Sequence, residues 1–157
     1  MDILLHAGNY LFSYRVAGIC VQNRKILLQK TVNDTAYAIP GGHAKFGETN
    51  AETLIREFYE EIGAAISVGD LKWVGELFFP WNDKPCHQIC LYYIVKINSG
   101  NIPDEGMFKG KDSNSKLEFH WIPFERLQDI EVYPPNAAEL VNHIEYDVQH
   151  FIYKENI

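Results

Sequence analysis

Three glutamates, Glu57, Glu60 and Glu61, are spaced so that their carboxylates gather on one face of a predicted helix. They repel one another, and they lie in the C-terminal half of that helix, where the helix dipole disfavours negative charge. A bound divalent cation would remove both penalties, because hard cations such as Mg²⁺ and Mn²⁺ prefer oxygen ligands. The spacing therefore indicates a metal site, and the alternative is an ordinary solvated acidic face.

The helix that carries these glutamates has clear start and stop signals. Thr49 and Glu52 have the spacing of a capping box, and Gly63 stands where helices end in a left-handed turn. We therefore predict a helix from about Asn50 to Ile62. Apolar residues at helical spacing give it a stripe that can face a core: Ala51, Leu54, Ile55, Phe58 and Ile62.

The segment before the helix predicts a sharp turn. Pro40 is followed by Gly41 and Gly42, and glycine permits the backbone conformations and close approach that such a turn needs. A strand, this turn and the helix would bring the polar residues together on a rigid scaffold, as in many active sites.

The wider spacing resembles the Nudix box. All the fixed glycine, glutamate and arginine positions of that box are present over 23 residues: Gly42, Glu48, Arg56, Glu57, Glu60, Glu61 and Gly63. Two positions outside this fixed pattern depart from common usage. Lys45 stands where many members carry an acid, and Ala64 where a bulkier aliphatic residue is common.

The resemblance implies an α+β fold, a Nudix-like α/β/α sandwich with a mixed β-sheet between helices. It also implies metal-dependent cleavage of a nucleoside diphosphate linked to another moiety, with Mg²⁺ or Mn²⁺ as cofactor. The implied metal ligands are Glu57, Glu60, Glu61, Glu48 as an auxiliary ligand and the carbonyl of Gly41. Arg56 resembles the arginine that holds these carboxylates in place and is grouped with the catalytic residues.

In this interpretation, a metal-bound water attacks phosphorus and a carboxylate takes its proton. The candidates for that base are Glu57 and three acids late in the chain, Glu105, Asp112 and Glu118. Glu118 is attractive because it follows a long polar segment and enters a predicted strand. The alternative for Glu118 is an ordinary surface residue at a strand end.

Substrate contacts are expected from side chains outside the fixed positions of the box. Aromatic residues in predicted loops can stack on a base or sugar, or else pack beneath their loops; these are Tyr37, Phe46, Trp81 and Tyr133. His43 is a candidate phosphate contact or a simple turn residue. The expected partner is a small-molecule nucleotide, either a nucleoside triphosphate or a nucleotide-sugar-like compound.

Three classes of function are compatible with these residues. The first is a pyrophosphohydrolase, the second a non-catalytic nucleotide-binding module or sensor, and the third an isomerase relative acting on isoprenyl diphosphates. The intact glutamates and Arg56 favour the first over a sensor, which could lose them freely. The isomerase group departs from the box, whereas this chain matches it.

Length and composition are those of one globular domain, residues 1–157. The formal net charge of −7 argues against a general nucleic-acid binder, which needs a basic face. No apolar run approaches the ~18 residues of a membrane span, and the N-terminus lacks a leader pattern, so we expect a cytoplasmic protein. The oligomeric state is left open.

Three cysteines provide no disulfide framework. Cys86, His87 and Cys90 have a spacing that invites a zinc site, but a second ligand pair is missing and the segment continues as an apolar run. We interpret them as strand residues.

The rest of the chain alternates strand patterns with turns. Residues 15–21 and 25–30 predict a hairpin, residues 71–79 another strand, and residues 87–97 a central strand. Residues 80–85 are expected to form a loop. Residues 98–116 are polar and glycine-rich, and so long an irregular segment predicts a lid, a binding loop or a mobile segment.

Two further helices are expected after this segment. A short one begins near Pro123. A long amphipathic one opens at Asn136, with Asn136 and Glu139 at capping spacing. Its predicted apolar stripe consists of Val141, Ile144, Val148, Phe151 and Ile152.

Overall fold

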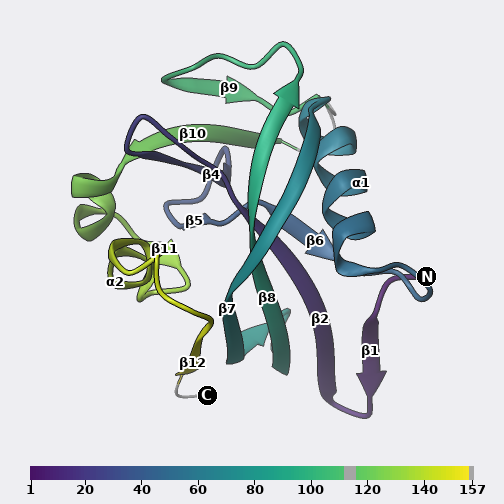
Figure 1. The fold of residues 1–157 in the computed structure, drawn as a ribbon. Coiled ribbons are helices and arrows are strands. Elements are labelled where there is room, and N and C mark those ends of the chain that lie inside the picture. Colours follow the sequence, from purple (N-terminus) through teal and green to yellow (C-terminus); the bar gives the residue numbers. More distant parts are fainter. Residues whose placement is uncertain (112–115, 156–157) are drawn as a thin grey trace.

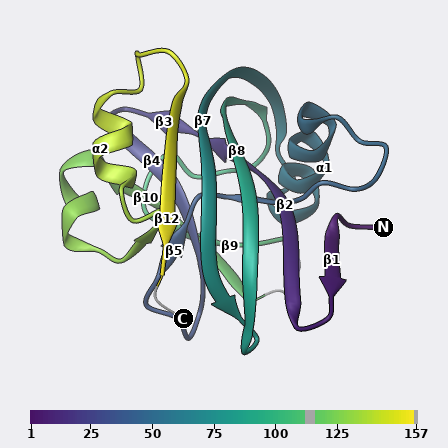
Figure 2. The same cartoon turned by 90° about the horizontal axis from the view of Figure 1, so that it is seen from below.

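The computed structural model describes residues 1–111 and 116–155 and contains two six-stranded sheets (Figures 1 and 2). The first sheet has the order β1 (Leu4–Ala7), β2 (Tyr10–Ile19), β8 (Lys84–Ser99), β7 (Ala65–Trp81) and β12 (Gln149–Lys154), with β6 (Gly41–His43) also paired to β2. It is a mixed sheet, because β2 runs parallel to β8 and β12 parallel to β7, while the other pairs are antiparallel.

The second sheet is smaller and packs beside the first. Its order is β11 (Val132–Tyr133), β5 (Tyr37–Ala38), β4 (Lys25–Thr31), β10 (Leu117–Pro123) and β9 (Met107–Lys109), with β3 (Val21–Gln22) paired to β4. The expected hairpin is present only near its turn, where β3 and β4 pair across Asn23 and Arg24, both at positive φ. Residues 15–19 belong instead to β2 of the first sheet.

Helix α1 (Asn50–Ile62) has the predicted boundaries. The Thr49 side chain accepts from the Glu52 N–H, Glu52 accepts from the Thr49 N–H, and Gly63 has φ +68°. The capping box and the left-handed stop are therefore confirmed. On the other side of the molecule lie the short 3₁₀-helix η1 (Phe124–Asp129) and helix α2 (Ala137–Asn142) (Figure 1).

Two apolar cores occupy the spaces between these layers. One joins α1 to the strands through Leu54 and Phe58, which pack with Val16 and Phe119. The other joins the opposite face of the strands to η1 and α2 and includes Trp73, Tyr92, Leu127, Leu140 and Val141. The expected sandwich, with mixed β-structure between helical layers, is confirmed.

The predicted long C-terminal helix is wrong. Helix α2 ends at Asn142, and residues Gln149–Lys154 form β12, which pairs parallel with β7. In β12 the buried Phe151 lies between exposed residues, an alternation with period two that suits a strand. β7 would otherwise have unpaired backbone groups along this edge, and β12 pairs with them. The Asn136 side chain makes no cap hydrogen bond either.

The predicted loop at residues 80–85 is mainly strand, whereas the described residues of the predicted loop 98–116 are strand only in part. β7 and β8 form one long hairpin whose turn is only Asn82-Asp83, both at positive φ as type I′ turns require. Trp81 and Pro85 therefore belong to strands. Of the segment 98–116, the start continues β8 and Met107–Lys109 forms β9, which pairs with β10. Residues 112–115 lie outside the described part.

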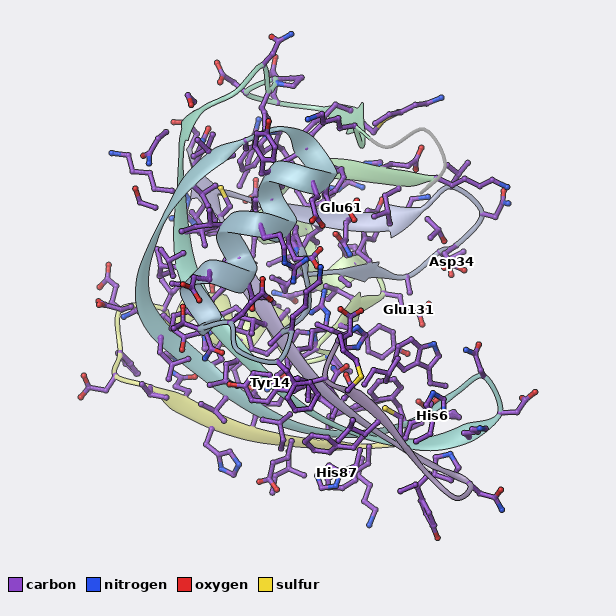
Figure 3. All side chains as sticks on the ribbon, turned by 90° about the vertical axis from the view of Figure 1, so that its right-hand side faces the viewer. His6, Tyr14, Asp34, Glu61, His87 and Glu131 are labelled. Carbon is purple, nitrogen blue, oxygen red and sulfur yellow. The ribbon has the colours of Figure 1, made fainter. Side chains whose placement is uncertain are left out.

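The interpretation of the cysteines as strand residues is confirmed. Cys86 and Cys90 are buried free thiols in β8, whereas His87 is exposed on the outer face of the sheet (Figure 3). In the described part of the chain, none of the helices is long and apolar enough to cross a membrane.

Candidate active site

The two glycines before α1 separate the side chain of Glu57 from a cavity that is described below, and we call them the glycine partition. Gly41 and Gly42 lie in β6 and pair with Ala17 and Val16 of β2. A Cβ atom at Gly41 would collide with the carbonyl oxygen of Val16, and one at Gly42 would collide with the carboxylate of Glu57. The close packing of Glu57 against this strand thus requires a residue without a side chain.

Arg56 holds several polar groups of the box together. Its Nε and Nη2 donate to the two carboxylate oxygens of Glu48 at 2.6 and 2.9 Å. Its Nη1 donates to Glu57 at 2.8 Å and to Glu60 at 3.3 Å, while Nη2 also donates to the backbone carbonyl of His43 at 3.1 Å. We call Arg56, Glu48, Glu57 and Glu60 the carboxylate network. Arg56 is placed to orient its members.

Glu48 is the most fully engaged carboxylate of this network. Besides its two bonds from Arg56, it accepts from the Lys45 N–H at 2.8 Å and from the Thr53 hydroxyl at 3.2 Å. The hydrogen bond from Arg56 is the main reason that the pKa of Glu48 falls to about 2. In this conformation, Glu48 acts chiefly as the anchor of Arg56.

Glu57 and Glu61 lie where α1 faces the strands. Both line a small cleft shared with Gln29, Gly41 and Phe119, and Figure 3 shows the side chain of Glu61 extending from α1 toward the strands. Burial raises the pKa of Glu57 above its ordinary value, although its hydrogen bond from Arg56 opposes the rise. A partly buried carboxylate of this kind favours a nearby cation.

The oxygen atoms at this site are the type of ligand that hard divalent cations prefer. Glu57, Glu60 and Glu61 supply carboxylate oxygens from one helix, and Gly41 can offer a backbone carbonyl from the facing strand. Within residues 1–111 and 116–155, no three His, Cys, Asp or Glu side chains already converge on one point that could enclose an ion. Arg56 holds one oxygen of Glu57 and one of Glu60, so the second oxygen of each could bind a metal while Arg56 keeps its position.

A cavity of about 620 Å³ lies on the other side of the glycine partition. Its size is that of a small-molecule site. It is lined by residues from both sheets: Arg15, Gln29, Ala38, Gly41, Gly42, His43, Leu77, Phe79, Pro80, Trp81, Gln88, Tyr92, Tyr133 and Glu155. Gln29 and Gly41 line both this cavity and the cleft at Glu57, so the two spaces adjoin.

His43 and Trp81 form one wall of the cavity. Their rings stack with a centroid distance of 5.6 Å and an interplanar angle of 11°. The Ser13 hydroxyl donates to Gln88 at 3.0 Å, so it is left to accept from Nε2–H of His43, also at 3.0 Å. Burial, and then the positive charge of Arg15, lower the pKa of His43. A neutral and oriented imidazole thus supports the indole of Trp81.

Several predicted site residues lie away from this cavity. Tyr37 packs edge-on against His120 at 5.2 Å. Phe46 is 56% exposed and does not line the cavity. Glu105 is a surface residue that pairs weakly with Lys25 at 3.7 Å. Asp112 lies outside the described residues.

Glu118 lies on the far side of its sheet from Glu57 and Glu61. Its neighbour Phe119 lines the cleft at Glu57 together with Gln29, which pairs with Phe119 in register. Since side chains alternate along strands, Glu118 and its partner Lys30 point to the opposite face. They form an ion pair at 3.1 Å, and hydrogen bonds from Lys30 and His120 lower the pKa of Glu118. These contacts make Glu118 a weak base.

The structure adds polar cavity residues that the sequence analysis missed. Arg15, Gln29 and Gln88 all line the cavity, and each is next to an apolar residue of its strand. A polar residue interrupting an apolar strand was the available signal. Its meaning depends on which strands pair and in which register, and a single sequence does not supply that information.

The fold and the site described above indicate one protein family, and comparison with known sequences identifies the same family. The sequence profile of the NUDIX domain matches residues 13–144, and the chain belongs to that family. An ADP-ribose pyrophosphatase from Methanocaldococcus jannaschii is 33% identical over 107 residues, which cover 66% of this chain and 59% of that protein. The chain thus matches little more than half the length of this relative.

Solved structures share the fold. A MutT protein from Bacillus halodurans has a TM-score of 0.64 at 16% identity, over 90% of both chains. A UDP-X diphosphatase has a TM-score of 0.62 at 17% identity, over 89% of this chain and 66% of the other.

Proposed function

We propose that this chain is a metal-dependent pyrophosphohydrolase that cleaves a nucleoside diphosphate linked to another moiety. The observation that carries the proposal is the shared wall of Gly41 and Gly42. Glu57 packs on one side of it, and a cavity of about 620 Å³ opens on the other. A substrate with its nucleoside in the cavity would present its diphosphate to the carboxylates. The names of the relatives, which include a pyrophosphatase and a diphosphatase, support this reaction class.

Different residues of the chain would bind the nucleoside and the metal. His43 and Trp81 offer a flat stacked surface for a base or sugar, and Tyr133 lies on the same cavity. Gln29 and Gln88 offer amide donors and acceptors. Glu57, Glu60 and Glu61 would hold Mg²⁺ or Mn²⁺, with Glu48 and Arg56 positioning them. When bound, the cation neutralises diphosphate charge and lowers the pKa of water.

Glu57 is the best-placed general base. It lies in the cleft next to the partition, where a water molecule beside the diphosphate would be within its reach. As the water oxygen bonds to phosphorus, Glu57 would take one water proton. The bridging P–O bond breaks, and the bridging oxygen leaves on the other phosphoryl group. Each product then carries a terminal phosphate.

The proposal is tested with a panel of nucleoside triphosphates and nucleoside diphosphate compounds, assayed with Mg²⁺ or Mn²⁺ and identified by product. Turnover of at least one compound is expected, with complete loss in EDTA. If no compound is cleaved with either metal, a nucleotide-binding module on the same fold becomes the better description.

Glu60→Gln and Glu61→Gln then separate metal ligands from an acidic surface. Each removes one of three crowded charges, so thermal stability without metal should stay level or rise by a few tenths of a kcal/mol. Calorimetric Mn²⁺ affinity and turnover should fall together. Glu125→Gln, an exposed acid on η1, serves as the matched control. Wild-type metal affinity in both helix variants would return α1 to an ordinary acidic surface.

A further inference from the structure

Arg15 is the cation that lines the cavity, among the described residues. It lies in β2 directly opposite His43 of β6 and Cys90 of β8. Its Nη2 donates to the carbonyl of Ile39 at 2.7 Å, and its Nη1 lies 3.8 Å from the sulfur of Cys90. These two contacts fix the plane of the guanidinium beside the Gly41–Gly42 partition.

The guanidinium forms no direct ion pair in the part of the chain that the structure describes. The ion pairs formed there use other cations, and Glu57 and Glu48 are both paired with Arg56. Arg15 is nevertheless partly buried. Glu57 attracts this guanidinium only at a distance and is bonded directly to Arg56. An anion that contacts Arg15 in the cavity would therefore add a direct ion pair to a partly buried charge, which is favourable.

The fixed orientation of Arg15 leaves donors for such an anion. A guanidinium carries five N–H groups in a planar fork, and the contacts with Ile39 and Cys90 occupy one on each terminal nitrogen. Planar forks match phosphate oxygens two at a time. The other ionised side chain that lines the cavity, Glu155, cannot supply this interaction, because a carboxylate only accepts hydrogen bonds.

We infer that Arg15 is the phosphate-binding residue of the cavity and holds the phosphoryl group attached directly to the nucleoside. This inference rests on the proposed function, because it assumes a diphosphate that crosses the partition. The carboxylates lie on the α1 side of Gly42 and serve the distal phosphoryl group. Arg15 lies on the cavity side, so it serves the group that remains with the base and sugar.

The alternative role for Arg15 is purely structural, since its bond to the carbonyl of Ile39 could serve only to shape the turn before Gly41. The two roles differ in what they predict for ligands without a second phosphate. A phosphate-binding Arg15 should favour a nucleoside 5′-monophosphate over the matched nucleoside, even without metal. A structural Arg15 should leave the two equally bound.

The test is calorimetric titration of the full chain in EDTA with AMP, GMP, CMP and UMP and with the four matched nucleosides. For the base that fits, wild-type protein should bind the monophosphate about 10- to 100-fold more tightly than the nucleoside, as charge-assisted hydrogen bonds provide. In Arg15→Gln the ratio of monophosphate affinity to nucleoside affinity should fall to about one, while nucleoside affinity changes little. Arg15→Lys keeps the charge but loses the fork and should retain part of the preference.

Arg126→Gln is the matched control, because it removes one positive charge from an exposed position on η1 outside the cavity. It should keep the wild-type preference, and thermal melts verify the fold of each variant. A monophosphate preference that survives in Arg15→Gln overturns the inference, as does equal binding of monophosphate and nucleoside by wild-type protein. Because no turnover is measured, these outcomes are independent of whether the chain hydrolyses a diphosphate.

Discussion

On the α1 side of Gly41 and Gly42, one guanidinium joins three carboxylates that come from a single short stretch of the chain. On the other side, the cavity is lined by residues of β2, β4, β5, β6, β7, β8 and β11 and by Glu155 beyond β12. The carboxylate network is dense in charge, whereas the cavity is lined mostly by aromatic, apolar and amide groups. Changes to the network should therefore act on the rate of the reaction, and changes to the cavity on affinity.

The largest effect is expected for Glu57→Gln. The amide keeps the shape of the side chain but cannot take a proton, and general-base catalysis typically contributes about 10²- to 10⁴-fold. We expect kcat to fall by about that factor while KM changes little. Steady-state kinetics on the best substrate of the panel gives both constants, with Glu125→Gln as control. A rise in KM at constant kcat would contradict the division between the two sides.

Gly42→Ala tests the partition itself. The added methyl group collides with the carboxylate of Glu57, so the carboxylate or the strand must shift. Misplacement of a catalytic group by about 1 Å can cost about 10²-fold in rate, and we expect a loss of that order in kcat. Gly69→Ala is the matched control, since its Cβ would meet only ordinary contacts. Equal kinetics in both variants would show that Glu57 needs no such closeness.

Trp81→Ala should act on the cavity side alone. Aromatic stacking on a base is worth about 1–3 kcal/mol, so we expect KM to rise by about tenfold with kcat nearly unchanged. Trp81→Phe keeps a ring to stack on and should retain most of the affinity. If kcat falls as much as KM rises, the wall formed by His43 and Trp81 also positions the reacting groups, and the contrast between the two sides weakens.

The smallest expected effect is the pH dependence that Glu48 contributes. Its pKa in the folded protein, about 2, lies below the ordinary value of 4.5. A carboxyl group whose pKa is lower in the folded than in the unfolded protein stabilises the fold at pH values above its ordinary pKa. This stabilisation is lost as the pH falls toward 2. Glu48→Gln should therefore be less stable than wild type near neutral pH, and the difference should shrink between about pH 5 and pH 2. Denaturant melts of metal-free protein across that range measure it; a constant difference would contradict the role of Arg56 as partner.

The contrast between the two sides also explains what could be predicted from the sequence. The box, the boundaries of α1, its capping box and the stop at Gly63 depend on neighbours in sequence, and local spacing predicts them. The β7–β8 hairpin was only partly anticipated, because Asn82-Asp83 is a two-residue turn hidden within a stretch that contains two prolines. Proline as a sign of a loop was misleading at this position.

The remaining errors share a long-range cause. Val148, Phe151 and Ile152 fit a helical stripe by spacing alone, whereas the open edge of β7 makes that segment a strand. Arg15 and Gln88 acquire a common role only because β2 and β8 pair in a register that places both on the cavity. Tyr37 and Phe46, which loop position and aromatic character favoured as substrate contacts, do not line the cavity. Ala38 does, and side chains alternate along β5, so Tyr37 points to the other face of the strand.

Because of the position of Trp81, ligand binding in the cavity can be followed by tryptophan fluorescence. The chain has three tryptophans, and the other two, Trp73 and Trp121, are only 1% and 5% exposed. Trp81 alone of the three lines the cavity, where its indole stacks on His43. A ligand that displaces water from this ring should shift its emission, while the two buried indoles supply a constant background. Intrinsic fluorescence can thus report occupancy without a labelled nucleotide, and Trp81→Phe provides the blank.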